Sequence, residues 1–398
     1  MKRPIHALIA KDLARKLVFV TGPRQIGKTT LSQQLQADCA PAQYFNYDVA
    51  ADKVRIERFG WLPTSKLVVL DELHKMPQWK GWLKGVWDGR SPQQQLLVTG
   101  SARMDTFRQA GDSLAGRYFS WRLHPISVRE WCTSSPASEA GQPPTPEEAL
   151  THLLNRGGFP EPCLYEATPQ GDVDARRWRE QYANGLVRED VLEFSRIQEI
   201  GSMRLLLDIL RTRVGSTLSL ASLGRDLGVS QPTVKRYIDV LQALYIVFMV
   251  QPWHHNIARS LQQAPKIYFF DTGMVNPPAG FTSDSPEAHG ARFENAVAGM
   301  LLKHVHFLQD SQAAPVDLHY VRDKAGAEID FTLSNEQQLT HLIECKWRDD
   351  TPHRAFGKFG DAWPQAQRLQ LVRFLRNAQV HKGVTILPAA PWLADLAA

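Results

Sequence analysis

A glycine-rich segment near the N-terminus has the spacing of a phosphate-binding loop. Residues 22–29 satisfy the pattern G-x-x-x-x-G-K-[ST] and follow an apolar run, Leu17–Thr21, that is expected to be a strand. In such a loop, backbone N–H groups surround the phosphates, and the helix that follows adds the positive end of its dipole. The residues predicted to bind the nucleotide are Gly22, Pro23, Arg24, Gln25, Ile26, Gly27, Lys28, Thr29 and Thr30. Lys28 would reach the β- and γ-phosphate oxygens, and the Thr29 hydroxyl would ligate Mg²⁺. The alternative is a strand-to-helix turn that binds nothing.

Two consecutive carboxylates follow a second apolar run. Residues 67–70 are all apolar, as in a strand buried on both faces, and Asp71 and Glu72 come next. They would therefore emerge at the carboxyl edge of a parallel sheet. Asp71 is suited to hold Mg²⁺ and Glu72 to polarise the attacking water, which favours hydrolysis over phosphoryl transfer to a small acceptor. A solvated strand end is the alternative.

A third strand-like run, residues 96–99, is followed by Gly100 and Ser101. If this strand lies between the other two, Thr99 or Ser101 would stand beside the γ-phosphate. Ser101 would equally well cap a helix. Further along, Arg117 follows a glycine, and it is either a surface arginine in a salt bridge or a finger that completes a neighbouring subunit's site.

Near the C-terminus, two strand-like segments bring acidic and basic groups together. They are residues 326–333 and 340–347. In the second, Glu344 and Lys346 are two residues apart and emerge on the same side of the strand, where Asp330 of the first would join them. Such a set suits Mg²⁺-assisted phosphodiester cleavage, with Asp330 and Glu344 as metal ligands, Lys346 acting on the water and Glu294 as a further carboxylate ligand. A surface ion pair is the plainer alternative.

Between these regions, residues 218–238 have the pattern helix, tight turn, helix. Gly228 permits the turn, Ser230 caps the second helix, and Pro232 lies in its first turn. Apolar positions at helical spacing would face inward, and residues 245–250 would supply a wing strand. The residues left outward for DNA contact are Gln231, Thr233, Lys235 and Arg236. Docking of a protein partner, or a spacer role, is the alternative.

Composition limits the remaining possibilities. The chain has 398 residues with 46 Lys and Arg against 41 Asp and Glu, a net charge of +5, and it is too long for one compact core. No apolar run approaches the roughly 20 residues that span a bilayer, so we expect no membrane segment. Neither a secretion signal nor a disulfide framework is recognisable, so a reducing cytoplasm is expected. The alternation of short strands and helices predicts an α/β fold.

These motifs together closely resemble the prokaryotic AAA+-like ATPases that carry a C-terminal DUF4143 region. The resemblance rests on residues 22–30, 70–72, 99–101 and 114–117, with further matches at residues 125–127 and Glu130. It implies ATP and Mg²⁺ as ligands, a homo-oligomer with shared sites, and a C-terminal part like restriction endonucleases, whose D…E-x-K spacing Asp330, Glu344 and Lys346 share.

The expected organisation follows from the motifs and the resemblance. It comprises a P-loop ATPase domain with a parallel sheet (1–132), a Pro/Ser-rich linker (133–148), a helical connector (149–215), a winged helix-turn-helix (216–262) and an α/β nuclease-like domain (263–398). The leading hypothesis is a Mg²⁺-dependent ATPase that couples nucleotide turnover to DNA or to a partner. The alternatives are an ATP-switched DNA endonuclease and a nucleotide-gated protein-binding module that cleaves nothing.

Overall fold

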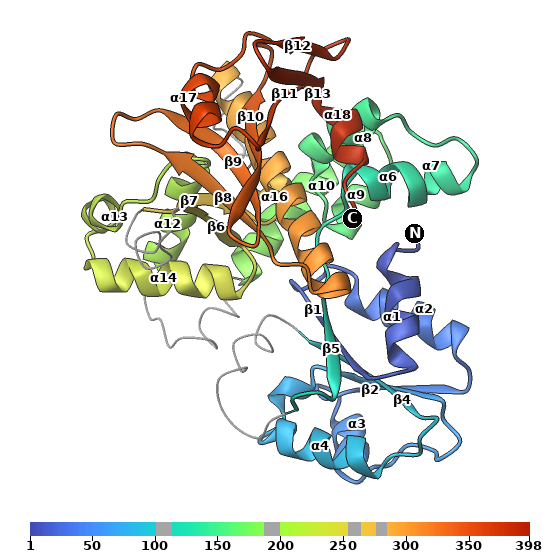
Figure 1. Cartoon of the computed structure of the whole chain (residues 1–398). Coiled ribbons are helices and arrows are strands. Elements are labelled where there is room, and N and C mark those ends of the chain that lie inside the picture. Colours follow the sequence, from blue (N-terminus) through green and yellow to red (C-terminus); the bar gives the residue numbers. More distant parts are fainter. Residues whose placement is uncertain (101–113, 187–199, 254–263, 276–284) are drawn as a thin grey trace. The chain divides into compact units, whose positions relative to one another are not determined.

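The computed structural model describes residues 1–100, 114–186, 200–253, 264–275 and 285–398. The chain forms two compact units, Met1–His124 and Pro125–Ala398. Figure 1 shows the elements of both. Among the described residues, no helix combines the length and the apolar character needed to cross a membrane.

A five-stranded parallel sheet forms the centre of the first unit. Its order is β2-β3-β4-β1-β5. The strands are β1 (Leu17–Thr21), β2 (Ala42–Asn46), β3 (Leu67–Asp71), β4 (Gln95–Gly100) and β5 (Tyr118–Arg122). The predicted parallel α/β sheet is thus confirmed, and β4 lies between β1 and β3 as the third motif requires. The edge strand β5 has no counterpart in the sequence prediction.

Helices cover this sheet because their apolar residues need its buried faces. They are α1 (Ile5–Leu13), α2 (Lys28–Asp38), α3 (Ala50–Glu57) and α4 (Trp79–Gly89), with a short 3₁₀ helix η1 (Leu73–Lys75) after β3. The apolar core lies between β1, β3 and β4 and the aromatic residues of α4. The carboxyl ends of β1 and β3 are held in register through β4, so the residues that follow these strands meet at one edge.

The second unit begins with short helices. They are α6 (Val128–Ser134), α7 (Pro136–Glu139), α8 (Pro146–Arg156), α9 (Pro160–Leu164), α10 (Pro169–Gly185) and α12 (Ile200–Arg211). Capping boxes start α6 at Ser127 and α8 at Thr145. The segment expected to be an exposed linker contains α7, because Ser135 caps this helix and Pro136 occupies its first position.

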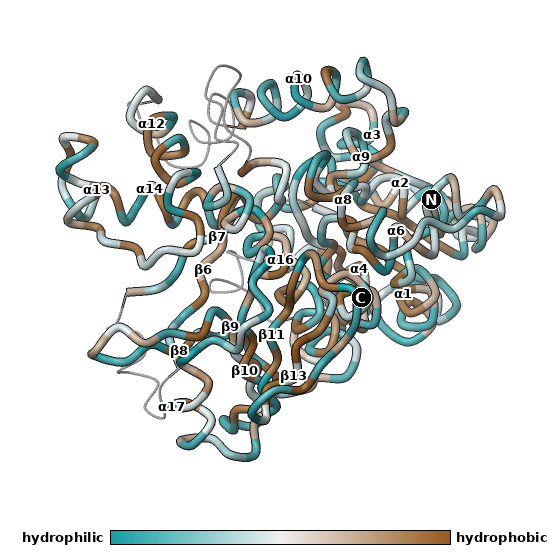
Figure 2. The backbone as a smooth tube through the Cα atoms, turned by 90° about the horizontal axis from the view of Figure 1, so that it is seen from above, coloured by the Kyte–Doolittle hydropathy of each residue, from teal (hydrophilic) through white to brown (hydrophobic). Residues whose placement is uncertain are grey.

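An eight-stranded sheet follows, in the order β12-β13-β11-β10-β9-β8-β6-β7. The strands are β6 (Val247–Pro252), β7 (Lys266–Phe269), β8 (Val316–Arg322), β9 (Glu328–Asn335), β10 (Gln338–Lys346), β11 (Gln367–Val372), β12 (Gln379–His381) and β13 (Val384–Pro388). Strands β10, β11 and β13 are parallel, whereas β8, β9 and β10 are antiparallel. Figure 2 shows hydrophobic stretches in β10, β11 and β13, as expected of strands that contribute to a core.

The long helix α16 (Pro286–Gln312) packs along this sheet against β7, β8 and β10 (Figure 1). Helices α17 (Ala355–Ala362) and α18 (Ala389–Ala394) and the 3₁₀ helix η4 (Thr272–Val275) complete the unit.

Two further helices, α13 (Leu220–Leu227) and α14 (Gln231–Ala243), form the predicted helix, turn and helix. Gly228 has φ 67°, the left-handed conformation the tight turn requires, and the Ser230 hydroxyl accepts a hydrogen bond from the Thr233 amide. The residues predicted as a wing strand largely form β6. This strand pairs with β7 and also with β8, so it belongs to the large sheet.

Candidate functional site

The glycines of the phosphate-binding loop are required by its backbone. Gly27 has φ 98° and caps α2 without a side chain, which leaves the first-turn N–H groups of this helix to an anion. Gly22 has φ 154°, and a Cβ there would lie 2.6 Å from the Leu123 carbonyl oxygen. A larger residue at either position would distort the loop.

Lys28 is the first residue of α2, and its side chain folds back over the loop. The Nζ atom donates to the carbonyl oxygens of Gly22 (3.0 Å) and Pro23 (2.7 Å). Only 7% of the residue is exposed. Burial lowers the pKa of Lys28 to about 8, although Glu72 and Asp71 oppose that shift. The ammonium is therefore held beside the loop with few partners, which favours a phosphate.

Asp71 is the last residue of β3, and three donors fix its carboxylate. The Thr99 hydroxyl donates to Oδ1 from 2.5 Å, the Glu72 amide donates to the same oxygen from 3.1 Å, and the Tyr44 hydroxyl donates to Oδ2 from 2.5 Å. The residue is only 5% exposed, so these three hydrogen bonds satisfy a buried polar group and fix its position. Thr99, which was expected near the γ-phosphate, holds Asp71.

Sequence reasoning missed Tyr44. It comes from β2, the neighbour of β3, and its hydroxyl interacts with the side chains of both Asp71 and Thr29. Burial, followed by the Asp71 carboxylate, raises the pKa of Tyr44, so the phenol stays a hydrogen-bond donor. The sequence signal that could have indicated Tyr44 is its place near the carboxyl end of a predicted strand.

Glu72 adopts a left-handed backbone conformation, with φ 54°. Such a conformation is strained for a residue with a side chain, and its amide is held by the Thr99 carbonyl oxygen at 3.0 Å. Burial and then Asp71 raise the pKa of Glu72. Its Oε2 lies 3.5 Å from His74 Nε2 and 3.8 Å from Lys75 Nζ. A carboxylate of raised pKa is a suitable proton acceptor.

The oxygen ligands near the loop fit a magnesium ion. The Thr29 hydroxyl and the Asp71 carboxylate are hard donors, and Tyr44 connects them. Ser101, which was expected to bind the nucleotide, lies outside the residues that the structure describes. Arg117 makes two hydrogen bonds to Asp88, of 3.0 and 3.2 Å. This pair matches the salt-bridge alternative in the single chain, and a role in a neighbouring subunit stays a prediction.

The C-terminal acidic and basic residues also meet. Lys346 Nζ lies 2.7 Å from Glu344 Oε1, the Cys345 amide donates to Asp330 Oδ2 (3.0 Å), and the Asp330 amide donates to Glu344 Oε2 (3.3 Å). Burial and then Asp330 raise the pKa of Glu294 to about 7 and that of Glu344 to about 8. The predicted residues therefore form one cluster.

Sequence reasoning missed the centre of this cluster, which is Lys266. Its Nζ lies 2.7 Å from Glu328, 3.2 Å from Asp330 and 3.4 Å from Glu294. Lysine at the start of the apolar run 266–270 was the available signal.

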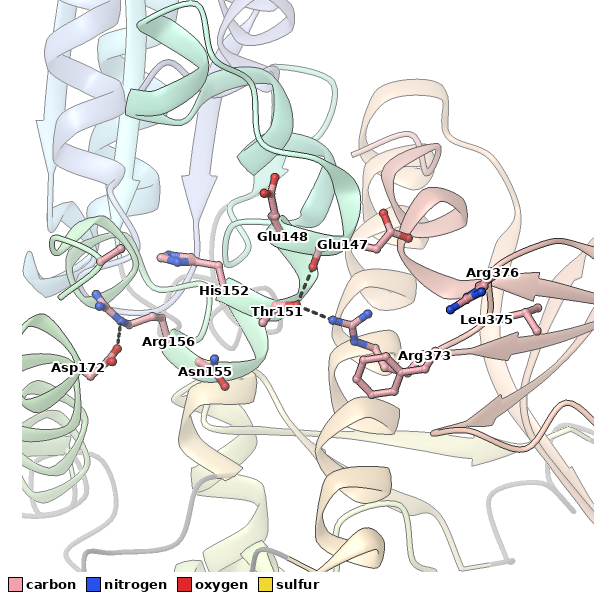
Figure 3. Close-up of a pocket in the computed structure, with 12 residues that line it drawn as sticks. Glu147, Glu148, Thr151, His152, Asn155, Arg156, Asp172, Arg373, Leu375 and Arg376 are labelled. Carbon is pink, nitrogen blue, oxygen red and sulfur yellow. Dashed lines mark hydrogen bonds and ion pairs between the residues drawn. The ribbon is translucent and has the colours of Figure 1, made fainter. Parts of the chain in front are cut away.

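A hollow of about 740 Å³ lies elsewhere in the second unit (Figure 3). Helix α8 forms one side and residues 373–376 after β11 form another. Arg373 points to Thr151, whose hydroxyl accepts its hydrogen bond, and Arg156 pairs with Asp172 (Figure 3). The lining carries both signs of charge, and its parts are too far apart in sequence to form a motif.

The four predicted DNA-contact residues lie on α14. Gln231, Lys235 and Arg236 are exposed, and Thr233 is partly exposed. Lys235 pairs with Asp239 at 2.9 Å, one turn further along the helix. Val234, Tyr237 and Ile238 are buried, so the polar residues occupy the outer face of the helix.

Three models of known protein families match successive parts of the chain. Residues 14–132 match the AAA domain, 147–285 a domain of unknown function, DUF8612, and 289–392 another, DUF4143. The large sheet crosses the last boundary, since β6 and β7 precede it and β8 to β13 follow it.

Relatives are found in bacteria and archaea. Uncharacterized proteins of Mycobacterium tuberculosis and Mycobacterium bovis are 29% identical over 332 residues, covering 83% of this chain and 70% of each relative. An uncharacterized protein of Methanocaldococcus jannaschii is 21% identical over 290 residues, and the match covers 70% of this chain and 60% of that protein. A solved structure of a Walker-type ATPase of Pyrococcus abyssi aligns with a TM-score of 0.44 at 14% identity, covering 68% of this chain and 93% of that one.

The structure and the family models agree with the resemblance seen in the sequence. The agreement concerns the loop, the strands around it and the domains matched at the two ends of the chain. The chain has the architecture of the AAA-like P-loop ATPases that carry a C-terminal DUF4143 region.

Proposed function

We propose that the chain is a Mg²⁺-dependent ATP hydrolase, and that its nucleotide state governs how the second unit engages DNA or a protein partner. The observation that carries the proposal is the convergence of loop and strand residues at one sheet edge. Tyr44 connects Thr29 with Asp71, and the carboxylates of Asp71 and Glu72 act on the Lys28 ammonium. Nucleotide hydrolysis needs these groups in one place.

In this proposal each residue has a separate task. On ATP binding, Lys28 leaves the two loop carbonyl oxygens and bonds the β- and γ-phosphates. Thr29 and Asp71 would hold Mg²⁺, which supplies positive charge to the phosphate oxygens. Glu72 orients the attacking water and accepts its proton. Tyr44 and Thr99 keep the Asp71 carboxylate aligned through their hydrogen bonds.

Substitution of Glu72 by Gln tests the hydrolytic role. The amide keeps the shape of the side chain but accepts a proton poorly, so turnover should fall about 10²–10⁴-fold. ATP affinity should stay close to that of the wild type. Phosphate release and titration calorimetry measure the two quantities, with Lys28→Ala as the variant that loses binding. Near wild-type turnover in Glu72→Gln would remove Glu72 from the mechanism.

For the second unit, the outer face of α14 supports DNA engagement. Lys235 and Arg236 are exposed in the helix that follows the Gly228 turn, and side chains in this position reach phosphates or base edges in helix-turn-helix proteins. The β6–β7 pair would serve as the wing. Homo-oligomer formation, with Arg117 reaching a neighbouring site, is part of the same proposal.

Duplex DNA binding across a range of salt concentrations tests this role. The Lys235→Ala and Arg236→Ala variants should each bind DNA more weakly. For each variant, the plot of log K against log salt concentration should become shallower by the amount expected for the loss of about one phosphate contact. Arg177→Ala is the matched control, because Arg177 is an exposed arginine on α10. Unchanged affinity and slope in both α14 variants would favour the protein-binding alternative.

A further inference from the structure

Lys266 is an uncommon residue in this fold because its charged group lies in the protein interior. Only 1% of the residue is exposed. Lysine is almost never fully buried unless it is paired, and here three carboxylates pair with it. They are Glu328 and Asp330 of β9 and Glu294 of α16. The ammonium therefore joins three elements, β7, β9 and α16.

The local structure fixes this position. Lys266 starts β7, which pairs with β6 and packs against α16. Tyr268 lies two residues further along the same face and donates to Glu294 Oε1 from 2.7 Å. Gly215 also lies close to this oxygen, since a Cβ there would lie 2.7 Å from Glu294 Oε1. These contacts set the position of Glu294 relative to Lys266.

The same contacts decide whether the cluster fits a metal ion. One carboxylate oxygen of Asp330 accepts a hydrogen bond from the Lys266 ammonium, and the other accepts one from the Cys345 amide. The two carboxylate oxygens of Glu344 likewise accept hydrogen bonds, one from the Lys346 ammonium and one from the Asp330 amide. Within the described parts of the chain, no group of three or more His, Cys, Asp or Glu side chains is arranged to hold a metal. The residues therefore do not fit Mg²⁺ in this arrangement.

We propose that Lys266 is the resident cation of the C-terminal cluster. It takes the position between Glu294, Asp330 and Glu328 that a divalent metal would need, so the cluster binds no Mg²⁺ and cleaves no phosphodiester bond. Its role is to join β7, β9 and α16 through ion pairs. This inference goes beyond the proposed ATPase and rejects the endonuclease alternative.

Physical reasoning gives the consequence of removing the ammonium. Lys266 is the shared cationic partner of three partly buried carboxylates. Its removal leaves their negative charge largely uncompensated, and a divalent cation is the most effective replacement. Lys266→Met keeps most of the apolar stem and should therefore create a metal site. Lys303→Met is the matched control, because Lys303 is also a buried lysine and pairs with a carboxylate outside the cluster, that of Glu130.

The experiment is a titration of the nucleotide-free full chain with Mn²⁺, with free Mn²⁺ measured by electron paramagnetic resonance. Wild type and Asp330→Asn should bind equal amounts of Mn²⁺, and Lys303→Met should match them. Lys266→Met should bind one additional Mn²⁺ per chain, and Lys266→Met/Asp330→Asn should lose it. Mn²⁺ should also raise the melting temperature of Lys266→Met above its metal-free value.

Two results would overturn the proposal. One is a Mn²⁺ site in the wild type that Asp330→Asn abolishes, and the other is a folded Lys266→Met variant that gains no Mn²⁺. If Lys266→Met does not fold, the comparison of wild type with Asp330→Asn still decides. Mn²⁺-dependent nicking of a supercoiled plasmid by the wild type, abolished in Asp330→Asn, would also refute it.

Discussion

The lowered pKa of Lys28 predicts how ATP affinity depends on pH. Burial places this pKa at about 8 in the free protein. A bound triphosphate favours the ammonium, so the pKa of Lys28 must rise when ATP binds. Below pH 8 the ammonium is already present and affinity should not change with its titration. Above pH 8, binding requires proton uptake, and affinity should fall as pH rises.

The size of the effect follows from one-proton linkage. At a pH equal to the free-state pKa, about half a proton is taken up per ATP, and one unit higher about nine-tenths. The dissociation constant should therefore rise about twofold at the pKa and about tenfold one unit above it, relative to its low-pH limit. Each further unit adds nearly a factor of ten until the pKa of the complex is reached.

Titration calorimetry with ATP and Mg²⁺, between about pH 7 and pH 9.5, measures both quantities. Repeating it in two buffers of different ionisation enthalpy gives the number of protons taken up. Lys28→Arg is the control, since a guanidinium stays charged throughout this range and its binding should lose the pH dependence. A wild-type affinity that is constant across this range, with no buffer dependence, would refute the assignment of a desolvated Lys28 to the phosphate site.

Three further predictions concern the same site. Tyr44→Phe removes one hydrogen bond to the Asp71 carboxylate, which is worth about 1.5–3 kcal/mol. The Mg²⁺ concentration for half-maximal turnover should therefore rise about tenfold or more. An unchanged Mg²⁺ requirement would show that Tyr44 does not position Asp71. Thr99→Val should act in the same direction, again measured by Mg²⁺ titration of phosphate release, and equal activity would contradict the three-donor arrangement. A mixture of the inactive Glu72→Gln and Arg117→Ala proteins should regain turnover if Arg117 serves a neighbouring subunit, and no recovery would leave Arg117 as the partner of Asp88 alone.

The strands around the glycine-rich loop could be predicted from the sequence because their signals are local. A strand buried on both faces shows as an uninterrupted apolar run, and β1, β3 and β4 all have one. The glycine and lysine spacing then places the loop after β1. Strand β5 lies at the sheet edge and is only partly buried, so its sequence mixes polar and apolar residues and gives no such run.

Partners that depend on tertiary register are not visible in the sequence. Tyr44 reaches Asp71 only because β2 lies beside β3, and Lys266 reaches Asp330 only because the fold of the large sheet brings the start of β7 close to β9. The spacing of Glu344 and Lys346 predicts their meeting, since both belong to one strand. The spacing of Glu344 and Lys346 gives no indication that another strand, β7, places Lys266 among the carboxylates.

The large sheet also bears on how this protein can be dissected. Strand β6 follows α14 directly, pairs with β7 and borders β8. The residues just before α13 are bonded to β7 and its N-terminal neighbour, since the Gly215 amide donates to the Ile267 carbonyl oxygen and the Leu218 amide to that of Pro265. A truncation between α14 and α16 would leave unpaired strand edges on both fragments, which promote aggregation. Shortened chains should therefore be cut before α6, so that the helix-turn-helix stays with the sheet.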